Sequence, residues 1–528
     1  MDAMVDEPGG GGAGLDGGEE ALEVWRVWRG GIECLGTERA WTADDLRAAA
    51  ARAGHVLKDA GVAAGDGVAV ALANTAAFPV LLMALLERRA TPLLVFAGTR
   101  EAELRRVVEE MHTAWVIHDF LPGVSQLVPG VYPVAAEISF GPVSVALLRT
   151  QRKTQDAGRL AGGCHTTVDV TCRSQSEEDG ASPLLCGAIL HPTSGTYGKS
   201  RYCVRNQRVA VAEARNYVES IACYDRIRVA TTTPLSHAYA YGFGLMASLL
   251  TDSTLVLDPV FNPKRVLRRE VERPSNILAL VPPMARALAR LAARETPPRL
   301  ARHTFYAGAP CPRDVMEEFR GVFGKELYAI YGTTETGAIS TSYDGGERLS
   351  GVGKPLRNVE VQVRHAEHYA ALRQGAGEIA VRSTSMMQGY LHDGAVEAPG
   401  DAWPTQDIGY FDGTGALSLI GRVRDIINLG GMKVDPVQVE SVLRGHPAVL
   451  DAAVYPGLHP DATEFVQAAV QVNNAGVDEE TLRAYCLAQL DAHKTPLRFH
   501  FVVEIPRTPS GKCLKIQCPE FPPSFILR

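Results

Sequence analysis

A short run of glycine, hydroxyl and basic residues has the composition of a phosphate-binding loop. It follows the apolar run from Leu184 to Leu190 and consists of Thr193, Ser194, Gly195, Thr196, Tyr197, Gly198, Lys199, Ser200 and Arg201. Glycines leave backbone NH groups open to phosphate oxygens, while hydroxyls and cations add hydrogen bonds and charge. A Gly/Ser surface turn is the alternative interpretation of the same residues.

The spacing of this loop excludes a Walker P-loop. That motif requires a glycine five residues before its Gly-Lys pair, and Thr193 stands at that position before Gly198 and Lys199. The chemistry that remains is phosphate binding by a different kind of Gly-rich loop.

The elements that must position this loop alternate between helix and strand. Apolar runs predict strands at 67–73, 91–96, 113–117, 228–233, 254–257, 277–281, 303–307 and 326–331, with helices at 46–60, 78–89, 241–250, 263–271 and 312–323. Such alternation favours parallel sheets covered by helices. Past Gly351, shorter strands and turns indicate a smaller β-rich subdomain, and the segment from about Ile426 predicts a separate α+β domain.

The loop at Thr193 resembles the TSGTTGKPK loop of the adenylate-forming superfamily, which includes acyl-CoA synthetases, nonribosomal adenylation domains and luciferases. Further motifs follow in that superfamily's order, from about Thr42 to Lys515. They are Tyr306 to Pro310, Tyr331 to Glu335, Gly353 to Pro355, Gly377 to Ile379, Gly389 with Tyr390, Thr405 to Asp407, Gly421 to Lys433, and Pro506 to Lys512.

The resemblance implies an α/β fold with two parts. A large N-terminal domain of two βα-layered subdomains plus a β-rich subdomain is followed by a small mobile α+β C-terminal domain. We expect a disordered tail over residues 1–20, the N-terminal adenylate-forming domain over 21–423 and the C-terminal domain over 424–528.

The same resemblance implies a set of site residues. Lys512, His237 and Glu335 are the expected catalytic residues, Glu335 is also the expected ligand of Mg²⁺, and Arg424 is the expected hinge. Gly430 and Gly431 are expected to line the access of the thiol. The residues expected to bind ATP or AMP are Thr193, Ser194, Gly195, Thr196, Gly198, Lys199, Gly308, Ala309, Pro310, Tyr331, Gly332, Thr333, Thr334, Asp407 and Arg422.

Each charged residue of this set also has a physical rationale. The Glu335 carboxylate suits a hard cation such as Mg²⁺, which would shield the charge of a triphosphate, although a solvated loop carboxylate is the alternative. Asp407 can accept both ribose hydroxyls with Arg422 nearby, or the two can form a structural salt bridge. Lys512 can reach the α-phosphate and the attacking carboxylate, or it is an ordinary exposed lysine.

The sequence departs from the family pattern at several positions. Tyr197 and Ser200 replace a small residue and a proline in the loop, and Gln406 replaces the glycine of the TGD motif. Arg424 stands where many relatives carry aspartate or lysine. These changes remove no charged group that the chemistry needs.

The resemblance implies a two-step ligase reaction with ATP as a substrate. A carboxylate attacks ATP to give acyl-AMP, and the thiol of CoA or of a carrier protein then displaces AMP to form a thioester. A CoA ligase is favoured, and a stand-alone adenylation enzyme that loads a carrier protein shares every motif. A nucleotide-binding module without activity is the third hypothesis, and the presence of Lys512, Glu335 and Asp407 opposes it.

The acid is less well defined by the sequence than the nucleotide. The segment from Pro234 to His237 is similar to the PLFH segment of acyl- and aryl-CoA ligases, and the FDxS pattern that serves an α-amino group is absent. We therefore expect an aryl or fatty acid in an apolar pocket lined by Tyr239, Tyr241, Phe243 and Tyr306. A place in the core is the alternative for these aromatic residues, and a satisfied core hydrogen bond is the alternative for His237.

Composition limits the other classes of function. The chain has 528 residues, a net charge of −7 and ten cysteines without a CxxC pair. This charge gives no general attraction to nucleic acid or an anionic membrane, so we expect neither as a partner. The cysteine pattern opposes a zinc site, and a reducing cytoplasm is the expected location.

Overall fold

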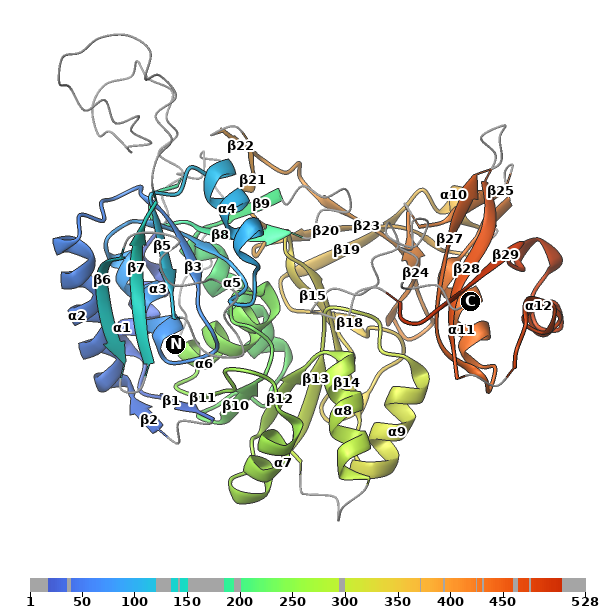
Figure 1. Ribbon diagram of the computed structural model, residues 1–528, viewed down its shortest axis with the longest axis horizontal. Coiled ribbons are helices and arrows are strands. Elements are labelled where there is room, and N and C mark those ends of the chain that lie inside the picture. Colours follow the sequence, from blue (N-terminus) through green and yellow to red (C-terminus); the bar gives the residue numbers. More distant parts are fainter. Residues whose placement is uncertain are drawn as a thin grey trace, which may run out of the picture.

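The computed structural model describes residues 18–35, 39–119, 134–140, 143–150, 185–193, 201–293, 300–370, 372–392, 395–423, 425–429, 432–458, 464–473 and 476–505. In these ranges the chain forms two large sheets, a smaller antiparallel sheet and a C-terminal sheet, with helices packed against them (Figure 1). The predicted α/β fold is confirmed. None of the helices in this part of the chain has both the length and the apolar character that a membrane span requires.

The first nine-stranded sheet is parallel at its centre and antiparallel at its edges. Its order is β18 (Lys354–Pro355), β15 (Gly337–Thr341), β14 (Leu327–Thr333), β13 (His303–Tyr306), β12 (Ile277–Leu280), β10 (Arg228–Thr231), β11 (Thr254–Leu257), β1 (Gly31–Cys34) and β2 (Arg39–Thr42). The carboxyl ends of β13 and β14 meet at one edge of this sheet, where ligands bind in folds of this class.

The second nine-stranded sheet has a parallel core of β8, β4, β3 and β5. Its order is β22 (Ala395–Glu397), β21 (Gly389–His392), β9 (Arg201–Arg205), β8 (Ile189–Thr193), β4 (Thr91–Leu94), β3 (Gly67–Ala71), β5 (Trp115–His118), β7 (Val143–Arg149) and β6 (Val134–Phe140). Its β8–β9 hairpin carries the predicted phosphate loop.

Helices fill the space between the two sheets and cover their outer faces. One core cluster joins inward residues of both sheets to α1 (Glu20–Val27), α2 (Ala43–Asp59), α3 (Ala77–Glu87), α5 (Gln207–Ser220), η2 (Ala240–Met246) and α6 (Ala247–Leu250). A second cluster packs the other face of the first sheet against α7 (Pro263–Glu272), α8 (Pro282–Ala292) and α9 (Arg313–Phe323). A third packs the second sheet against α4 (Glu101–Glu110).

Local sequence explains several of these helices. A capping box between Thr42 and Asp45 starts α2, and Asn206 caps α5 by accepting a hydrogen bond from Val209 N. Helix α3 is buried on all sides between the sheets, which explains its apolar sequence. The predicted helix at 241–250 is instead the π-helix η2 followed by the short α6, and π-helical turns are rare and often found at functional sites.

A four-stranded sheet, a three-stranded sheet and two two-stranded hairpins complete the described chain. The β-rich part contains β19 (Val359–Arg364), β20 (Gly377–Ser383), β23 (Trp403–Phe411) and β24 (Leu417–Arg422), with α10 (Ala366–Tyr369) and the hairpin of β16 (Tyr343–Asp344) and β17 (Glu347–Arg348). The C-terminal part contains β25 (Ile427–Leu429), β26 (Met432–Val434), α11 (Pro436–Arg444), β27 (Val449–Leu458), β28 (Glu464–Val472), α12 (Glu479–Leu487), η3 (Ala492–Lys494) and β29 (Arg498–Val502).

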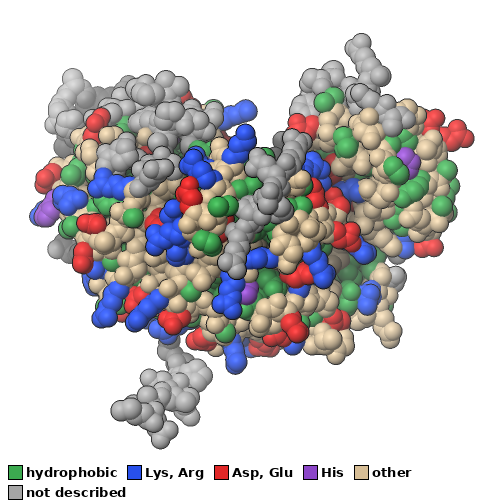
Figure 2. Space-filling view, turned by 90° about the horizontal axis from the view of Figure 1, so that it is seen from below, with side chains coloured by type: hydrophobic (Ala, Val, Ile, Leu, Met, Phe, Trp, Pro, Cys, Tyr) green, Lys and Arg blue, Asp and Glu red, His purple; other side chains and the backbone are tan. Residues whose placement is uncertain are grey.

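Charges of both signs cover the face of the molecule seen in Figure 2. Lys and Arg side chains lie beside Asp and Glu side chains there, rather than in a stripe of one sign. This arrangement agrees with the small net charge of −7.

Candidate active site

The predicted phosphate loop is closed by a pair of strand residues. Thr193 at the end of β8 pairs with Arg201 at the start of β9, and Thr193 Oγ1 donates to the Arg201 carbonyl over 3.2 Å. The predicted loop residues Ser194, Gly195, Thr196, Gly198 and Lys199 lie outside the described residues. The described hairpin therefore brings the two ends of the loop together at the carboxyl end of β8.

A tight turn after β14 presents the predicted metal ligand. The strand ends at Thr333, and the turn passes through Thr334, Glu335 and Thr336 into β15. A Cβ atom at Gly332 would lie 2.4 Å from the carbonyl oxygen of Gly337, so the hairpin closes this tightly only with glycine there. The sequence motif thus has a steric reason, and it leaves the Glu335 side chain half-buried.

Glu335 is linked to the phosphate hairpin through Tyr390. The Tyr390 hydroxyl donates a hydrogen bond to Glu335 Oε1, and the Arg201 guanidinium carbon lies 4.9 Å from the centre of the Tyr390 ring. Strand pairing explains this arrangement, because Tyr390 on β21 is opposite Cys203 on β9, two residues beyond Arg201 on the same face. Burial and the nearby Glu335 charge raise the pKa of Tyr390, so its hydroxyl remains a donor.

Asp407 is held between two donors from different strands. Its Oδ1 accepts from Arg422 Nε over 2.9 Å, and its Oδ2 accepts from the Tyr331 hydroxyl over 2.7 Å. Asp407 and Arg422 are directly opposite each other in β23 and β24. A carboxylate has about four acceptor positions, so both oxygens retain capacity for a ribose hydroxyl. The predicted nucleotide residues on β14, β23 and β24 are therefore in contact.

The residue before Asp407 has an unusual backbone conformation. Gln406 has φ +65°, in the left-handed region that favours glycine. The glycine of the family's TGD motif is replaced here, and the backbone has kept a shape suited to glycine. Asp407 therefore follows a strained residue.

The predicted adenine segment follows β13 at the same sheet edge as the Glu335 turn. Gly308 has φ +86° and is exposed with Pro310, while Ala309 between them is half-buried. Because β13 and β14 are parallel neighbours, this segment lies beside the Tyr331 strand. The structure thus brings two of the predicted nucleotide segments to one edge.

The aromatic residues predicted for the acid pocket divide into two groups. Phe243 is fully buried and its ring lies 5.1 Å from that of Tyr217, 5.7 Å from that of Tyr224 and 5.1 Å from that of Phe305. Tyr239 stacks on Phe243 at 5.3 Å. Phe243 is thus the centre of an aromatic cluster inside the core.

Tyr241 and Tyr306 lie apart from that stack in different ways. Tyr241 is fully buried and makes an edge contact with His191, with ring centres 5.2 Å apart. Tyr306 belongs to the core beneath α8 and α9, because it follows Phe305 in β13 and successive strand residues point to opposite faces. The structure does not bring Tyr306 together with the other three.

His237 lies three residues before η2. Its side chain is exposed to solvent, yet the protein atoms around it lower its pKa by desolvation. His237 is therefore a neutral imidazole that is surrounded by protein atoms and still open to solvent on one side, so it can contact a bound ligand.

Several predicted residues cannot be placed in this geometry. Arg424, Gly430, Gly431 and Lys512 lie outside the described residues. Conversely, sequence reasoning missed the contact that Tyr390 makes and the buried pair of Arg205 and Glu213. The Gly389-Tyr390 motif pointed to the first, whereas no local pattern marks the second.

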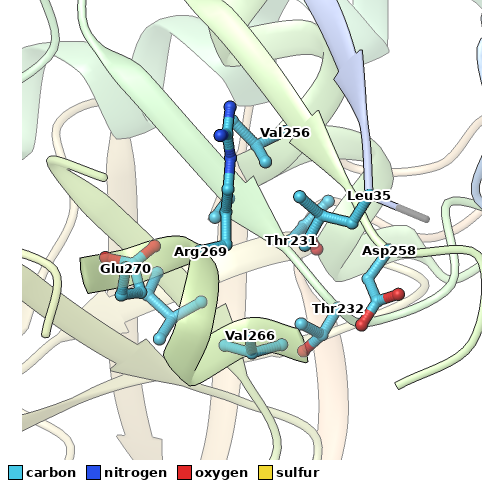
Figure 3. A pocket seen from close by; sticks show the side chains of 10 residues that line it. Leu35, Thr231, Thr232, Val256, Asp258, Val266, Arg269 and Glu270 are labelled. Carbon is cyan, nitrogen blue, oxygen red and sulfur yellow. The ribbon is translucent and has the colours of Figure 1, made fainter. Parts of the chain in front are cut away.

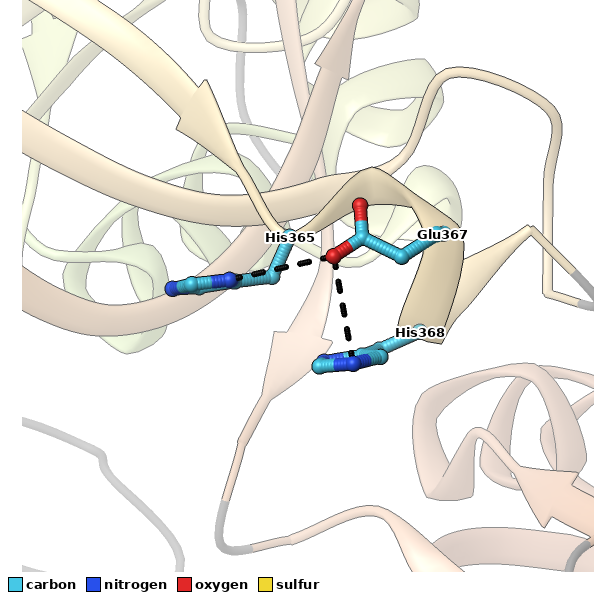
Figure 4. Close-up of side chains that lie close together, drawn as sticks. All are labelled: His365, Glu367 and His368. Atoms are coloured by element: carbon cyan, nitrogen blue, oxygen red, sulfur yellow. Dashed lines mark ion pairs between the residues drawn. The ribbon is translucent and has the colours of Figure 1, made fainter.

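Two other features of the described residues lie apart from this site. His365, Glu367 and His368 form an exposed cluster in which Glu367 Oε1 lies 3.9 Å and 3.8 Å from a nitrogen of each histidine (Figure 4). A small pocket under α7 is lined by side chains such as Thr232, Asp258 and Glu270 (Figure 3). Asp258 is bonded to Arg265 and Glu270 to Ser275, so both carboxylates already have partners within the fold.

Comparison with known proteins gives the same assignment as the motifs. The AMP-binding enzyme family matches residues 23–391, and the AMP-binding enzyme C-terminal domain matches residues 438–512. The 4-coumarate–CoA ligase-like 9 of Oryza sativa subsp. japonica is 28% identical over 513 residues, which cover 92% of this chain and 88% of that protein. The 2-succinylbenzoate–CoA ligase of Bacillus licheniformis is 31% identical over 339 residues, which cover 62% of this chain and 69% of that protein.

A solved structure agrees over nearly the whole length. The amide bond synthetase McbA from Marinactinospora thermotolerans superposes with a TM-score of 0.68 at 26% identity, covering 95% of this chain and 98% of that one. The family match spans well over half of the chain, and ATP is a substrate of this family. The chain therefore belongs to the AMP-binding enzyme family, the adenylate-forming superfamily, and is an AMP-forming acid–thiol ligase.

Proposed function

We propose that the chain activates a hydrophobic carboxylic acid, aryl or fatty, and transfers the acyl group to the pantetheine thiol of CoA. In the first step a carboxylate oxygen attacks the α-phosphorus of ATP, the bond to the β-phosphate breaks, and pyrophosphate leaves. In the second the thiolate sulfur attacks the acyl carbon and AMP leaves with both electrons of the broken C–O bond. The thiol proton passes to solvent.

The observation that carries this proposal is the link between the phosphate hairpin and the Glu335 turn. Arg201 on β9, Tyr390 on β21 and Glu335 in the turn after β14 form one continuous line of contacts. Tyr390 therefore holds Arg201, a cation next to the phosphate loop, at a fixed position relative to Glu335, a carboxylate suited to a metal ion. The first step brings two anions together, and such positioning supplies much of the rate.

The residues present fit a Mg²⁺ ion. Glu335 is half-buried, and only its Oε1 accepts a hydrogen bond from a described residue, which leaves Oε2 available. Hard oxygen donors of this kind are the ligands that Mg²⁺ prefers. When bound, the ion would neutralise triphosphate charge, and Glu335 would hold it.

We propose the domain boundary and the hinge that the motifs of the sequence predict. The tail would end before α1, which begins at Glu20, the N-terminal domain would extend to residue 423, and the mobile C-terminal domain would cover 424–528, with Arg424 as the hinge. Rotation about Arg424 would exchange Lys512 for the face containing Gly430 and Gly431 between the two steps.

The acid would enter beside His237, with the apolar part of the substrate directed towards η2. The stacked pair of Tyr239 and Phe243 supports an apolar partner there. Tyr241 stays in the proposed pocket set, whereas Tyr306 packs on the other side of β13 and is left out of it. A charged α-ammonium group without a carboxylate partner would be strongly disfavoured.

Two other acceptors deserve a direct comparison with CoA. A carrier protein presents the same pantetheine thiol and needs the same motifs. An amine is the second, because the chain is 26% identical to a protein whose name is amide bond synthetase. We propose CoA first, since the curated relatives named above are described as CoA ligases or as ligase-like.

The cytoplasm is the proposed location. The half-exposed Cys223 and Cys311 are free thiols. Unpaired thiols are typical of a reducing compartment.

Pyrophosphate exchange tests the proposal. The purified protein is given ATP, Mg²⁺ and single acids from panels of aryl, short-chain, medium-chain and amino acids, and each active acid is then offered CoA, a carrier protein or simple amines. We expect exchange with an apolar acid and a CoA thioester as the main product. An α-amino acid as the best substrate would overturn the assigned acid class, and an amide as the main product would overturn CoA as acceptor.

A further inference from the structure

A buried ion pair lies between the end of β9 and helix α5. Arg205 Nη2 is 2.7 Å from Glu213 Oε2, and the two side chains are only 1% and 2% exposed. Buried charges are costly unless paired, so each of these residues depends on the other. The reaction described above uses neither.

The second oxygen of Glu213 holds the turn that carries Glu335. Glu213 Oε1 accepts a hydrogen bond from Ala338 N over 3.2 Å, three residues after Glu335. A Cβ atom at Gly337 would lie 2.9 Å from Glu213 Cδ, so the carboxylate is in direct contact with the backbone of the turn. A shift of Glu213 would therefore move the turn.

Arg205 supports the same turn through Ser385. Its Nη2 donates to the Ser385 carbonyl at 3.5 Å, and Ser385 Oγ donates to the Thr336 carbonyl over 2.8 Å. Arg205 is also the last residue of β9, the strand that begins with Arg201. The pair thus connects the phosphate hairpin to the Glu335 turn at two points, Thr336 and Ala338.

The pair also contacts the helix on the acid side. A Cβ atom at Gly242 in η2 would lie 2.6 Å from the Glu213 carboxylate, so only glycine permits this approach. One carboxylate therefore touches β9 through Arg205, the turn through Ala338, and η2 through Gly242.

We propose that Glu213 and Arg205 are positioning residues for adenylation, which fix the Glu335 turn relative to the phosphate hairpin. The inference rests on the proposed function. A displacement of about 1 Å at a catalytic group can cost on the order of a hundredfold in rate, so a rigid link of this kind affects the chemical step. The pair touches no reacting atom and acts through the turn.

Stability alone is a poor explanation of this pair. Replacement of a buried ion pair by apolar residues of similar volume is often neutral or stabilising, whereas removal of one partner is strongly destabilising. This asymmetry separates a role in positioning from a role in folding. Apolar replacement of both residues should keep the stability and lose the contacts to the turn, whereas removal of one charge should lower the stability and can keep those contacts.

The test uses two variants with opposite expected effects. The double variant Arg205→Met with Glu213→Met removes both charges together with the acceptor for Ala338 N. The single variant Glu213→Gln keeps a side-chain oxygen for Ala338 N but leaves Arg205 without its counter-ion. For each, the melting temperature, the kcat and KM of pyrophosphate exchange, and the rate of thioester formation from supplied acyl-AMP are measured.

We expect each variant to lose the property that the other keeps. The double variant keeps its melting temperature near that of the wild type but loses at least about tenfold in the kcat of exchange, because the turn is no longer held. Glu213→Gln melts at a lower temperature, yet below that temperature its exchange kcat stays within about threefold of the wild type. Thioester formation from supplied acyl-AMP is retained in both variants.

A matched pair elsewhere provides the control. Arg265 Nε donates to Asp258 Oδ1 over 2.9 Å, and Asp258 Oδ2 accepts from Asn262 N over 3.2 Å, so this carboxylate also bridges an arginine and a backbone NH. Asp258→Met with Arg265→Met should leave exchange unchanged. The proposal is overturned if the folded Arg205/Glu213 double variant exchanges pyrophosphate at the wild-type rate, or if the control pair reduces exchange equally. Wild-type protein without exchange on any acid would instead refute the proposed function.

Discussion

Tyr390 donates a hydrogen bond to Glu335 from a strand that pairs directly with the phosphate hairpin. The hydroxyl fixes one oxygen of the carboxylate, while the face of the same ring lies against the Arg201 guanidinium. One aromatic side chain therefore fixes the positions of both Glu335, the proposed metal ligand, and Arg201, the cation beside the phosphate loop.

Tyr390→Phe removes this hydrogen bond and keeps the ring. We expect the kcat of pyrophosphate exchange to fall about tenfold, because Glu335 gains rotational freedom that the transition state must then restrict. Tyr369→Phe is the matched control, since Tyr369 donates to Glu378 over 2.8 Å in the β-rich part of the chain. Equal exchange rates in the two variants would contradict a special role for Tyr390.

Asp407→Ala should raise the apparent KM for ATP more than that for the acid, because its proposed partners are ribose hydroxyls. Tyr331→Phe removes one of the two donors to Asp407 and leaves the carboxylate in place. Its effect on the KM for ATP should be in the same direction and smaller. Steady-state exchange kinetics with each substrate varied in turn measure both effects, and equal changes in both KM values would refute a ribose contact.

Gln406→Gly should stabilise the protein. A non-glycine residue at φ +65° carries a cost of about 1 kcal/mol that glycine avoids. Gln362, which lies in the extended strand β19, provides the control, since the same substitution there should destabilise by about 0.5–1 kcal/mol. Thermal unfolding of the two variants checks the difference, and a lower melting temperature for Gln406→Gly would contradict the strain.

Acid should destabilise the fold through His118. Burial lowers the pKa of this imidazole to about 4, whereas an unfolded histidine titrates near about 6.5. Between these pH values the unfolded state binds one more proton than the folded state. The contribution of His118 to the free energy of unfolding is therefore fully present above pH 6.5 and falls by about 1.4 kcal/mol per pH unit towards pH 4. In His118→Asn, urea unfolding from pH 7.5 to pH 4.5 should show a shallower loss, and parallel curves for the two proteins would count against this assignment.

Lys512→Ala should separate the two half-reactions. If Lys512 acts only in adenylation, the variant forms no acyl-AMP from acid and ATP but still converts supplied acyl-AMP to thioester, because thiol attack occurs with the C-terminal domain rotated. Arg424→Pro should have the opposite effect, since it fixes φ at the hinge and slows the second step. A folded Lys512→Ala protein that has lost both half-reactions would refute this division.

Most of the central elements followed from the sequence. Strands at 254–257 and 303–307 and the helix at 312–323 were predicted within a residue or two of β11, β13 and α9, because buried parallel strands give continuous apolar runs between amphipathic helices. The helix at 241–250 was identified, but its π-helical start was not, since the hydrogen-bond pattern of a buried glycine-rich helix leaves no periodic signal.

The candidate site was predictable where backbone geometry demands particular residues. The glycine of the Tyr331–Glu335 motif is required by a close backbone contact, and such constraints leave a mark on the sequence. Buried polar contacts leave no such mark. Arg205 and Glu213 are eight residues apart, too far along a single helix or strand for their side chains to meet, and they meet because β9 leads directly into α5.

The aromatic cluster around Phe243 also limits how substrate range can change. Its ring packs against Phe305 of β13, the strand that leads to the predicted adenine segment, and against Tyr217 of α5, while Tyr239, from the proposed acid pocket, stacks on it. A substitution at Phe243 that enlarges room for a bulkier acid therefore also loosens the strand that precedes the nucleotide segment. New acid specificities in this chain should arise first at residues outside the cluster, since changes inside it alter the fit of both substrates together.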